Sequence, residues 1–221
     1  MIDTLLSYVA PHHCCGCGKT GSLLCHDCKY NITYETKNVC LACGRPTFSQ
    51  GVCNTCKAPY SQAWCVGDRK DVLQRLVGLY KFERTKSAYR DLAGLLDDIL
   101  PQLPENTVIV PIPTIPAHIR ERGYDHTLLL AKRLATLRGL SVARVLARSN
   151  NTMQRHATAA SRSRQAKFAF KVAGEIKQNV NYLVIDDVMT TGATIRYATK
   201  ALKEAGADRV WVAVLARQTL D

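Results

Sequence analysis

The hydrophobic positions after residue 61 follow two spacings that alternate along the chain. Apolar residues three and four positions apart predict helices, whereas continuous apolar runs predict strands buried on both faces. The predicted helices cover residues 69–82, 88–100, 124–139 and 193–206. The predicted strands cover residues 62–68, 107–113, 142–146, 168–172, 180–186 and 209–216. This alternation indicates an α/β fold, with a parallel sheet flanked by helices.

Three stretches depart from this pattern. Residues 114–123 lack a helical or strand spacing, so we expect a loop there. Residues 148–167 are polar and rich in Ser and Arg, which predicts a second and longer loop. The first 15 residues have the spacing of a short amphipathic helix.

The first 60 residues differ from the rest in their cysteines. Nine of the ten cysteines precede residue 60, and eight of them form C-x-x-C pairs. Two intervening residues let both thiolates reach one tetrahedral metal ion from a tight turn. We therefore expect two Zn(Cys)4 sites, taken in sequence along the chain, although a cross-braced pairing has the same spacing. The expected ligands are Cys14, Cys17, Cys25 and Cys28, then Cys40, Cys43, Cys53 and Cys56.

These metal sites have the composition of structural ones. All eight expected ligands are cysteines, which leaves no position where a metal-bound water would react. Iron could occupy the same ligands, but zinc is the commoner occupant. A stretch this short, with few large apolar residues, needs such a cross-link to fold. We predict a zinc-ribbon module over residues 1–60 and an α/β domain over residues 61–221.

Residues 180–194, VNYLVIDDVMTTGAT, carry the clearest chemical signal. A predicted strand delivers two adjacent carboxylates, Asp186 and Asp187, to the carboxyl edge of the sheet, where open α/β folds bind ligands. A Thr- and Gly-rich turn follows, and its hydroxyl and N–H groups at a helix N-terminus suit a phosphate. The alternative is an ordinary buried strand followed by a polar turn. That interpretation is less favourable, because two adjacent carboxylates without a partner are costly to bury. The stretch resembles the 5-phosphoribosyl-1-diphosphate (PRPP) signature of type I phosphoribosyltransferases.

A second strand end repeats this arrangement. After the predicted strand at 107–113, Arg120 and Arg122 arrive just before Gly123. Guanidinium groups bind phosphate oxygens in pairs, and glycine lets a ligand approach the backbone. The alternative interpretation is the exposed first turn of a helix that carries basic residues, which would have a similar sequence. We expect these residues to bind the diphosphate of PRPP.

The net charge of +12 is concentrated in one segment. Residues 117–171 hold 12 Lys and Arg against 2 Asp and Glu, so this segment alone carries +10. A localised basic field indicates a polyanionic partner, either PRPP or nucleic acid, and a solvated basic face is the alternative. Arg155, Arg162 and Arg164 lie in its loop. Such a loop could close over a reactive diphosphate or follow a nucleic acid backbone.

Two features bear on the location of the protein. No apolar run approaches the 18 or more residues that a membrane span needs. The N-terminus lacks the basic segment and the cleavage site of a signal peptide. We expect a cytoplasmic protein without a membrane span, whose cysteines are reduced.

The order of these motifs resembles the ComF family of competence-associated proteins and its GntX-like relatives, over about residues 5–217. This resemblance implies a double zinc ribbon fused to a type I phosphoribosyltransferase domain. It implies that Asp186 and Asp187 hold the ribose hydroxyls and the hydration shell of Mg²⁺. The 5′-phosphate would bind Thr190, Thr191, Gly192, Ala193 and Thr194.

The resemblance also assigns residues nearer the diphosphate. Lys81 fits a Lys-aromatic pair of the family, and Gln154 fits a Gln of its basic loop. Arg122 and Gly123 begin a box in which Asp125 and His126 replace the usual Asn and Gln. Gln165 stands where Asn is usual. The Asp125 departure places a negative charge near the expected diphosphate.

Two functions follow from this resemblance. The first is an enzyme that displaces diphosphate from PRPP with a nitrogen nucleophile, with Asp186 and Asp187 as catalytic groups. The second is a PRPP-responsive module without catalysis that binds single-stranded DNA through residues 117–171 during DNA uptake, with other competence proteins as partners.

Overall fold

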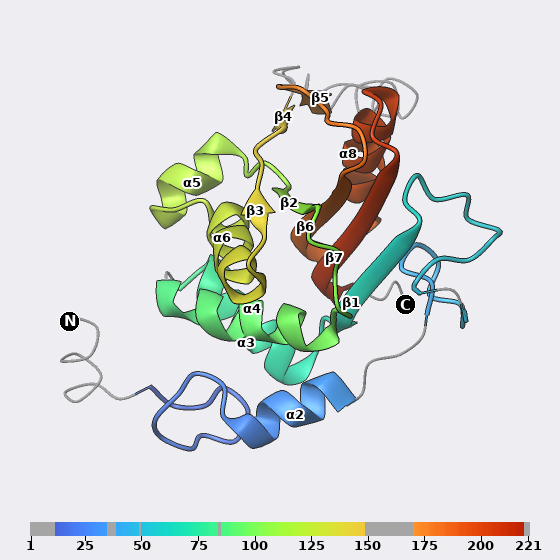
Figure 1. The fold of residues 1–221 in the computed structure, drawn as a ribbon. Coiled ribbons are helices and arrows are strands. Elements are labelled where there is room, and N and C mark those ends of the chain that lie inside the picture. Colours follow the sequence, from blue (N-terminus) through green and yellow to red (C-terminus); the bar gives the residue numbers. More distant parts are fainter. Residues whose placement is uncertain (1–11, 35–38, 49, 84, 149–169, 219–221) are drawn as a thin grey trace, which may run out of the picture.

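A five-stranded parallel sheet forms the centre of the computed structural model, which describes residues 12–34, 39–48, 50–83, 85–148 and 170–218. The order of its strands is β1-β7-β6-β2-β3 (Figure 1). The strands are β1 (Gln62–Asp68), β2 (Thr107–Pro111), β3 (Ser141–Val142), β6 (Asn181–Met189) and β7 (Arg209–Arg217). The central strands β6 and β7 are buried along most of their length, as their continuous apolar runs predict.

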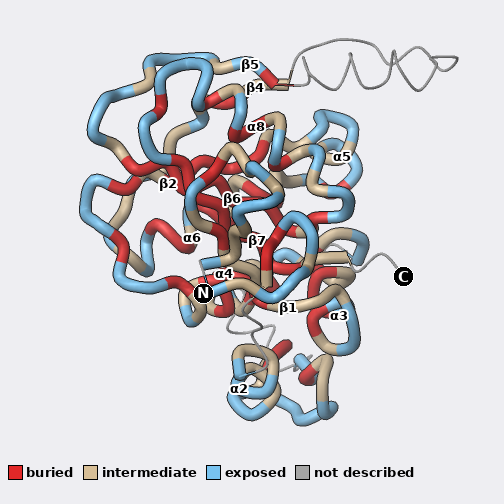
Figure 2. Tube along the Cα trace, turned by 90° about the vertical axis from the view of Figure 1, so that its right-hand side faces the viewer, coloured by how far each residue is buried: buried red, intermediate tan, exposed pale blue. Residues whose placement is uncertain are grey.

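Helices cover both faces of this sheet. One face packs α4 (Tyr89–Ile99) and α6 (His126–Arg138), with α3 (Asp71–Lys81) beside them and the 3-10 turn η1 (Lys86–Ala88) between α3 and α4. The other face packs α8 (Ala193–Glu204). Two apolar cores result, one on each face of the sheet, and buried residues concentrate there in Figure 2. The predicted α/β class and its parallel sheet are confirmed.

Two local predictions were wrong. Residues 114–123 hold a short helix, α5 (Pro116–Arg122). Pro116 presets the first turn, and Gly123 ends the helix in the left-handed conformation with φ of +82°, two signals that need no apolar spacing. The predicted strand at 142–146 is two strands: β3 joins the main sheet, whereas β4 (Leu146–Arg148) pairs antiparallel with β5 (Phe170–Val172).

The two cysteine clusters pack in different places. The first cluster extends into α2 (His26–Tyr34), which carries Cys28, and the neighbouring Leu23 and Leu24 join the core beside α3 and α4. The second cluster contributes Leu41 to the opposite core, together with Tyr60. Figure 1 shows α2 beneath α3 and α4, and the following loops beside β1. The cysteine-rich segment is therefore attached to both faces of the α/β domain, and the boundary at residue 60 stays a prediction.

Two expectations concern residues outside the described ranges. The N-terminal amphipathic helix was predicted largely on residues 1–11, and the long basic loop largely on residues 149–169. Among the described residues, no helix combines the length and the apolar character needed to cross a membrane.

Candidate functional site

Asp186 and Asp187 project past the end of a neighbouring strand. The predicted strand stopped at Asp186, but β6 continues to Met189 because β7 pairs with it as far as Arg217. On the other side β2 ends at Pro111, opposite Ile185. The backbone after β2 leads into α5, so Asp186 and Asp187 lie beyond the last residue with which β2 pairs. This is the carboxyl edge of the sheet, as predicted from the sequence.

The Thr- and Gly-rich turn joins β6 to α8. Gly192 has φ of +74°, a left-handed backbone conformation that favours glycine. Thr190 and Thr191 are exposed, and Thr191 Oγ1 accepts a hydrogen bond from the Ala193 N–H. The turn therefore presents hydroxyls and the first N–H groups of α8 to solvent, as a phosphate site requires. We refer to residues 190–194 as the phosphate loop.

Asp187 is the centre of a buried polar network. Its Oδ2 lies 2.7 Å from Lys81 Nζ, at the end of α3, and 2.7 Å from His126 Nε2, at the start of α6. Its Oδ1 accepts a hydrogen bond from the Val188 N–H. Asp187 is only 3% exposed. Its burial is tolerable because the Lys81 cation and the His126 ring lie against Oδ2 and the Val188 N–H donates to Oδ1.

Arg122 extends this network. It lies at the end of α5, is 8% exposed, and places Nη1 2.9 Å from His126 Nδ1. Its guanidinium carbon is 5.9 Å from the centre of the Phe82 ring, a cation–π contact, and Phe82 is 66% exposed at the rim of the site. The predicted diphosphate group Arg122 and the predicted ribose group Asp187 are thus joined through His126.

Asp125 has a structural role that its charge did not suggest. Its Oδ1 accepts hydrogen bonds from the Leu128 N–H at 3.1 Å and from the Thr114 hydroxyl at 2.8 Å. Asp125 is therefore the N-cap of α6, a position at which Asp and Asn are equally suitable. Asp in place of the usual Asn of the family therefore preserves this cap. Its carboxylate accepts from a backbone N–H and a hydroxyl group.

The two adjacent acids have opposite protonation tendencies. Burial, followed by the charge of Asp187, raises the pKa of Asp186 to about 8. Burial also acts to raise the pKa of Asp187, but the His126 hydrogen bond and the Lys81 charge outweigh it and hold that pKa below its usual range. These opposite shifts favour the protonated form at Asp186 and the ionised form at Asp187.

Arg148 is a site residue that the sequence did not identify. It lies at the end of β4, donates from Nε to the Pro113 carbonyl at 2.7 Å, and stacks over Phe170. Its positive charge acts to lower the pKa of Asp186. The β4–β5 pairing and the contact with Pro113 position Arg148, and both join segments that are far apart in the sequence, so a local motif does not indicate it.

The structure brings together only part of the predicted set. Asp186, Asp187, Lys81 and Arg122 converge, and the phosphate loop follows β6 directly. Arg120 is exposed on α5, and Gly123 ends that helix. Several predicted residues lie outside the described ranges, namely Gln154, Arg155, Arg162, Arg164 and Gln165.

The cysteines form the two sequential clusters that were preferred over cross-bracing. One is Cys14, Cys17, Cys25 and Cys28, and the other is Cys40, Cys43, Cys53 and Cys56, with the four sulfurs of each within 4.8 Å of one another. The Cys17–Cys25 and Cys43–Cys53 sulfurs are 3.6 Å and 3.8 Å apart. Four sulfurs about 2.3 Å from a tetrahedral zinc ion lie about 3.8 Å apart. Both sites therefore fit structural Zn²⁺.

Hydrogen bonds to the sulfurs support this assignment. Cys14 Sγ accepts from the N–H groups of Gly16 and Cys25. Hydrogen bonds from Arg45 lower the pKa of the Cys43 thiol to about 6. Such donors favour the thiolate form that binds metal.

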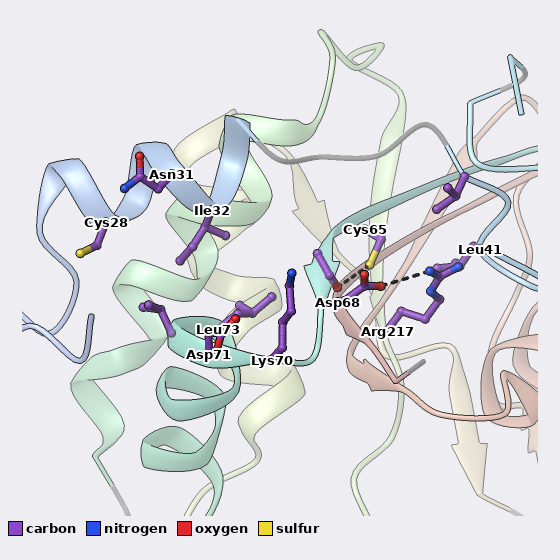
Figure 3. Close-up of a pocket in the computed structure, with 13 residues that line it drawn as sticks. Cys28, Asn31, Ile32, Leu41, Cys65, Asp68, Lys70, Asp71, Leu73 and Arg217 are labelled. Atoms are coloured by element: carbon purple, nitrogen blue, oxygen red, sulfur yellow. Dashed lines mark hydrogen bonds and ion pairs between the residues drawn. The ribbon is translucent and has the colours of Figure 1, made fainter. Parts of the chain in front are cut away.

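Two cavities lie where the cysteine clusters meet the α/β domain. A cavity of about 180 Å³ separates α2 from the end of β1, with Ile32 and Leu73 on its walls and the Asp68–Arg217 ion pair at one side (Figure 3). A hollow of about 370 Å³ lies between Tyr60 and the phosphate loop. The second cysteine cluster supplies Cys56 to the wall of this hollow, so that cluster borders the candidate phosphate site.

Comparison with known families assigns the class of the protein. Residues 119–219 match the phosphoribosyl transferase domain family, and residues 5–57 match the double zinc ribbon domain family. The fold and the candidate site thus define a phosphoribosyltransferase-like protein with an N-terminal double zinc ribbon.

Comparison with individual proteins assigns the family. The chain is 31% identical over 197 residues to the DNA utilization protein YhgH of Salmonella typhimurium, covering 81% of this chain and 84% of that protein. It is 26% identical over 201 residues to the competence protein ComFC of Bacillus subtilis, and the match covers 85% of this chain and 81% of that protein. It is 27% identical over 225 residues to the competence protein F of Haemophilus influenzae, and the match covers 87% of this chain and 96% of that protein. The chain belongs to this ComF family of competence and DNA utilization proteins.

Proposed function

We propose that this protein binds PRPP with Mg²⁺ and transfers its phosphoribosyl group to a nitrogen nucleophile. The observation that carries the proposal is the position of two buried carboxylates beyond the end of β2, directly before an exposed phosphate loop at the start of α8. Carboxylates bind sugar hydroxyls, and the loop suits the 5′-phosphate. A ribose 5-phosphate joins these two kinds of group in one molecule.

Asp186 and Asp187 would also hold the magnesium ion. Carboxylate oxygens are the hard donors that Mg²⁺ takes, and Mg²⁺ keeps several waters when one or two carboxylates bind it. In the described structure these oxygens lie at the same edge as Arg122 and Lys81, which suits a metal bound together with a diphosphate. Bound Mg²⁺ would neutralise negative charge on the diphosphate leaving group.

The side chains have distinct roles in this proposal. Arg122 donates to the diphosphate oxygens, because Nη1 is committed to His126 whereas Nε is a buried donor with no partner among the described residues. Lys81 supplies a second positive charge. Asp187 would act as a weak base toward the incoming nitrogen, because its lowered pKa keeps it ionised but makes it a poor proton acceptor. These groups would stabilise the charge that develops as the bond from C1 to the diphosphate breaks.

Diphosphate release tests this activity. The purified zinc-loaded protein is incubated with Mg–PRPP and a panel of nucleobases and amines, with the Asp186→Asn/Asp187→Asn variant as control. We expect release that depends on one acceptor class and disappears in the variant. PRPP binding without release for any acceptor would contradict catalysis and leave a PRPP-responsive binding protein.

A second function is favoured by the charge of residues 117–171, and we propose it as an alternative use of the same surface. Arg120, Lys132, Arg144 and Lys171 are exposed within the described part of this segment. They would neutralise the phosphates of single-stranded DNA, and affinity would then fall steeply with salt. Binding of a labelled oligonucleotide at several salt concentrations, with Lys132→Gln/Arg144→Gln as the comparison, tests this. A salt-independent affinity, or one unchanged in the variant, would contradict it.

A cytoplasmic location is part of the proposal. A reducing compartment keeps the eight cluster cysteines available as zinc ligands.

A further inference from the structure

Arg148 is held in place by two contacts with separate parts of the chain. It is the last residue of β4 and lies opposite Phe170, the first residue of β5. Its Nε donates a hydrogen bond of 2.7 Å to the Pro113 carbonyl, and its guanidinium carbon lies 5.0 Å from the centre of the Phe170 ring. A guanidinium anchored through Nε and one face keeps both terminal nitrogens, Nη1 and Nη2, for a further ligand.

These two terminal nitrogens have no hydrogen-bond partner in the described part of the chain. Arg148 is half-buried, and the described residues give it no ion pair with a carboxylate. Neither a backbone carbonyl nor an aromatic ring neutralises its charge. Because a cation withdrawn from water is unfavourable without an opposite charge, the arrangement favours an anion at Nη1 and Nη2.

The carbonyl that anchors Arg148 lies beside the candidate site. The Ile112 N–H donates to the Ile185 carbonyl at 3.0 Å, so the chain after β2 is still hydrogen-bonded to β6 at that point. Pro113 follows Ile112, and Asp186 follows Ile185. The anchor of Arg148 and the first of the two acids are therefore the next residues of neighbouring segments, although β4 is not part of the main sheet.

Arg122 lies near the same loop. Thr114 follows Pro113, and the Thr114 hydroxyl oxygen is 3.3 Å from His126 Nδ1. Arg122 Nη1 is 2.9 Å from that ring nitrogen. Two guanidinium groups, one from β4 and one from α5, are thus placed near adjacent residues of the loop that leads from β2 to α5.

We infer that Arg148 binds the diphosphate of PRPP through Nη1 and Nη2, together with Arg122. This inference deepens the proposed function and rests on it for the identity of the ligand. Two guanidinium groups near one loop suit an anion with two phosphate groups, because each guanidinium donates in pairs to phosphate oxygens. The contacts of Arg148 with Pro113 and Phe170 order the side chain beforehand, so binding costs less entropy.

Two simpler ligands separate binding of the diphosphate from support of the loop. Ribose 5-phosphate lacks the diphosphate, whereas inorganic diphosphate lacks the sugar. In Arg148→Gln, affinity for PRPP and for inorganic diphosphate, both with magnesium, should fall about tenfold or more, because hydrogen bonds between charged groups are lost. Affinity for ribose 5-phosphate should stay within about twofold, because that ligand does not contact Arg148. A side chain that only supported the loop would lower all three affinities when removed.

Arg148→Lys tests the need for two terminal nitrogens. A lysine keeps the charge but has one terminal nitrogen, which cannot hold the Pro113 carbonyl and the diphosphate as the guanidinium does. This variant should recover only part of the loss in diphosphate affinity. Full recovery would overturn the paired contact.

Arg209→Gln is the matched control. Arg209 is exposed at the first residue of β7, at the opposite edge of the sheet, so the variant makes the same change in charge away from the site. Its affinities for all three ligands should stay within about twofold of the unmodified protein, because salt screens an exposed and distant charge. A loss of diphosphate affinity equal to that of Arg148→Gln would assign the effect to net charge and overturn the inference.

Isothermal titration of the zinc-loaded protein measures these affinities. Equal diphosphate affinity in Arg148→Gln and the unmodified protein would overturn the inference, while PRPP binding by the unmodified protein leaves the proposed function standing. Parallel losses for all three ligands would also overturn it. If the unmodified protein binds diphosphate but not PRPP, the proposed function fails, and the diphosphate titration alone decides the role of Arg148. If it binds neither, both fail.

Discussion

Asp186 and Asp187 are adjacent in sequence but differ in their surroundings. Asp187 contacts Lys81 and His126 directly, whereas Asp186 accepts the Asp187 N–H and lies near the positive charge of Arg148. Burial is the largest influence on both pKa values, but at Asp187 the hydrogen bond of His126 and the charge of Lys81 together outweigh it. The sequence predicted that both acids would share one edge, but it could not predict this difference, because the partners come from α3, α6 and β4.

This difference predicts how stability depends on pH. The pKa of Asp186 is raised from 3.8 to about 8 on folding, so the folded state binds more protons than the unfolded state between these values. The Asp186 contribution to stability is therefore present below pH 4 and is lost as the pH rises toward 8. The variant Asp186→Asn mimics the protonated acid. Its stability should therefore fall less steeply between pH 5 and pH 8 than that of the unmodified protein.

Urea midpoints of the zinc-loaded protein without magnesium would measure this dependence. If the urea midpoint changes with pH to the same extent in the unmodified protein and in Asp186→Asn, the raised pKa is contradicted. Asp187 has the opposite sign, because its lowered pKa adds stability that is lost only as the pH falls toward acid values. Measurements above pH 5 keep its contribution nearly constant.

Helix ends, more than helix interiors, position the side chains of this site. Arg122 ends α5, Asp125 and His126 begin α6, and Lys81 ends α3. The apolar spacing predicted α3 and α6 because both have periodic positions, and it missed α5 because that helix is defined by Pro116 and Gly123. The sequence thus predicted most of the elements but not the turn that aims Arg122 into the site.

The cap of α6 predicts a specific loss of stability. Asp125→Ala removes the acceptor for the Leu128 N–H and for the Thr114 hydroxyl, and should destabilise the protein by about 1 kcal/mol. Asp125→Asn keeps the cap and should change stability by less than half of that. Chemical denaturation of both variants measures the difference. Equal stability of Asp125→Ala and the unmodified protein would show that the cap contributes nothing.

At the scale of the whole molecule, the two zinc ribbons serve different faces of one α/β domain. The spacing of the cysteines predicted both clusters and their sequential pairing, which the structure confirms. It could not predict where each cluster packs, because that depends on a few apolar residues such as Leu24 and Leu41. Only the second cluster borders the hollow beside the phosphate loop.

This asymmetry predicts that the two zinc sites are not equivalent. Cys17→Ser and Cys43→Ser each remove one ligand from one site and should each expose the local segment to protease. Cys43→Ser should also weaken PRPP binding, because the wall beside the phosphate loop loosens, whereas Cys17→Ser should weaken it less. Limited proteolysis and calorimetric PRPP titration measure these effects. Equal affinities in the two variants would contradict a role of the second ribbon in the site.

The central claim is that Asp186, Asp187 and the phosphate loop form a site for Mg–PRPP. Isothermal titration of the zinc-loaded protein with PRPP, in the presence and absence of magnesium, tests it most directly. We predict magnesium-dependent binding that is abolished in Asp186→Asn/Asp187→Asn, with the variant still folded by circular dichroism. Unchanged affinity in a folded double variant, or no binding by the unmodified protein, would contradict the claim.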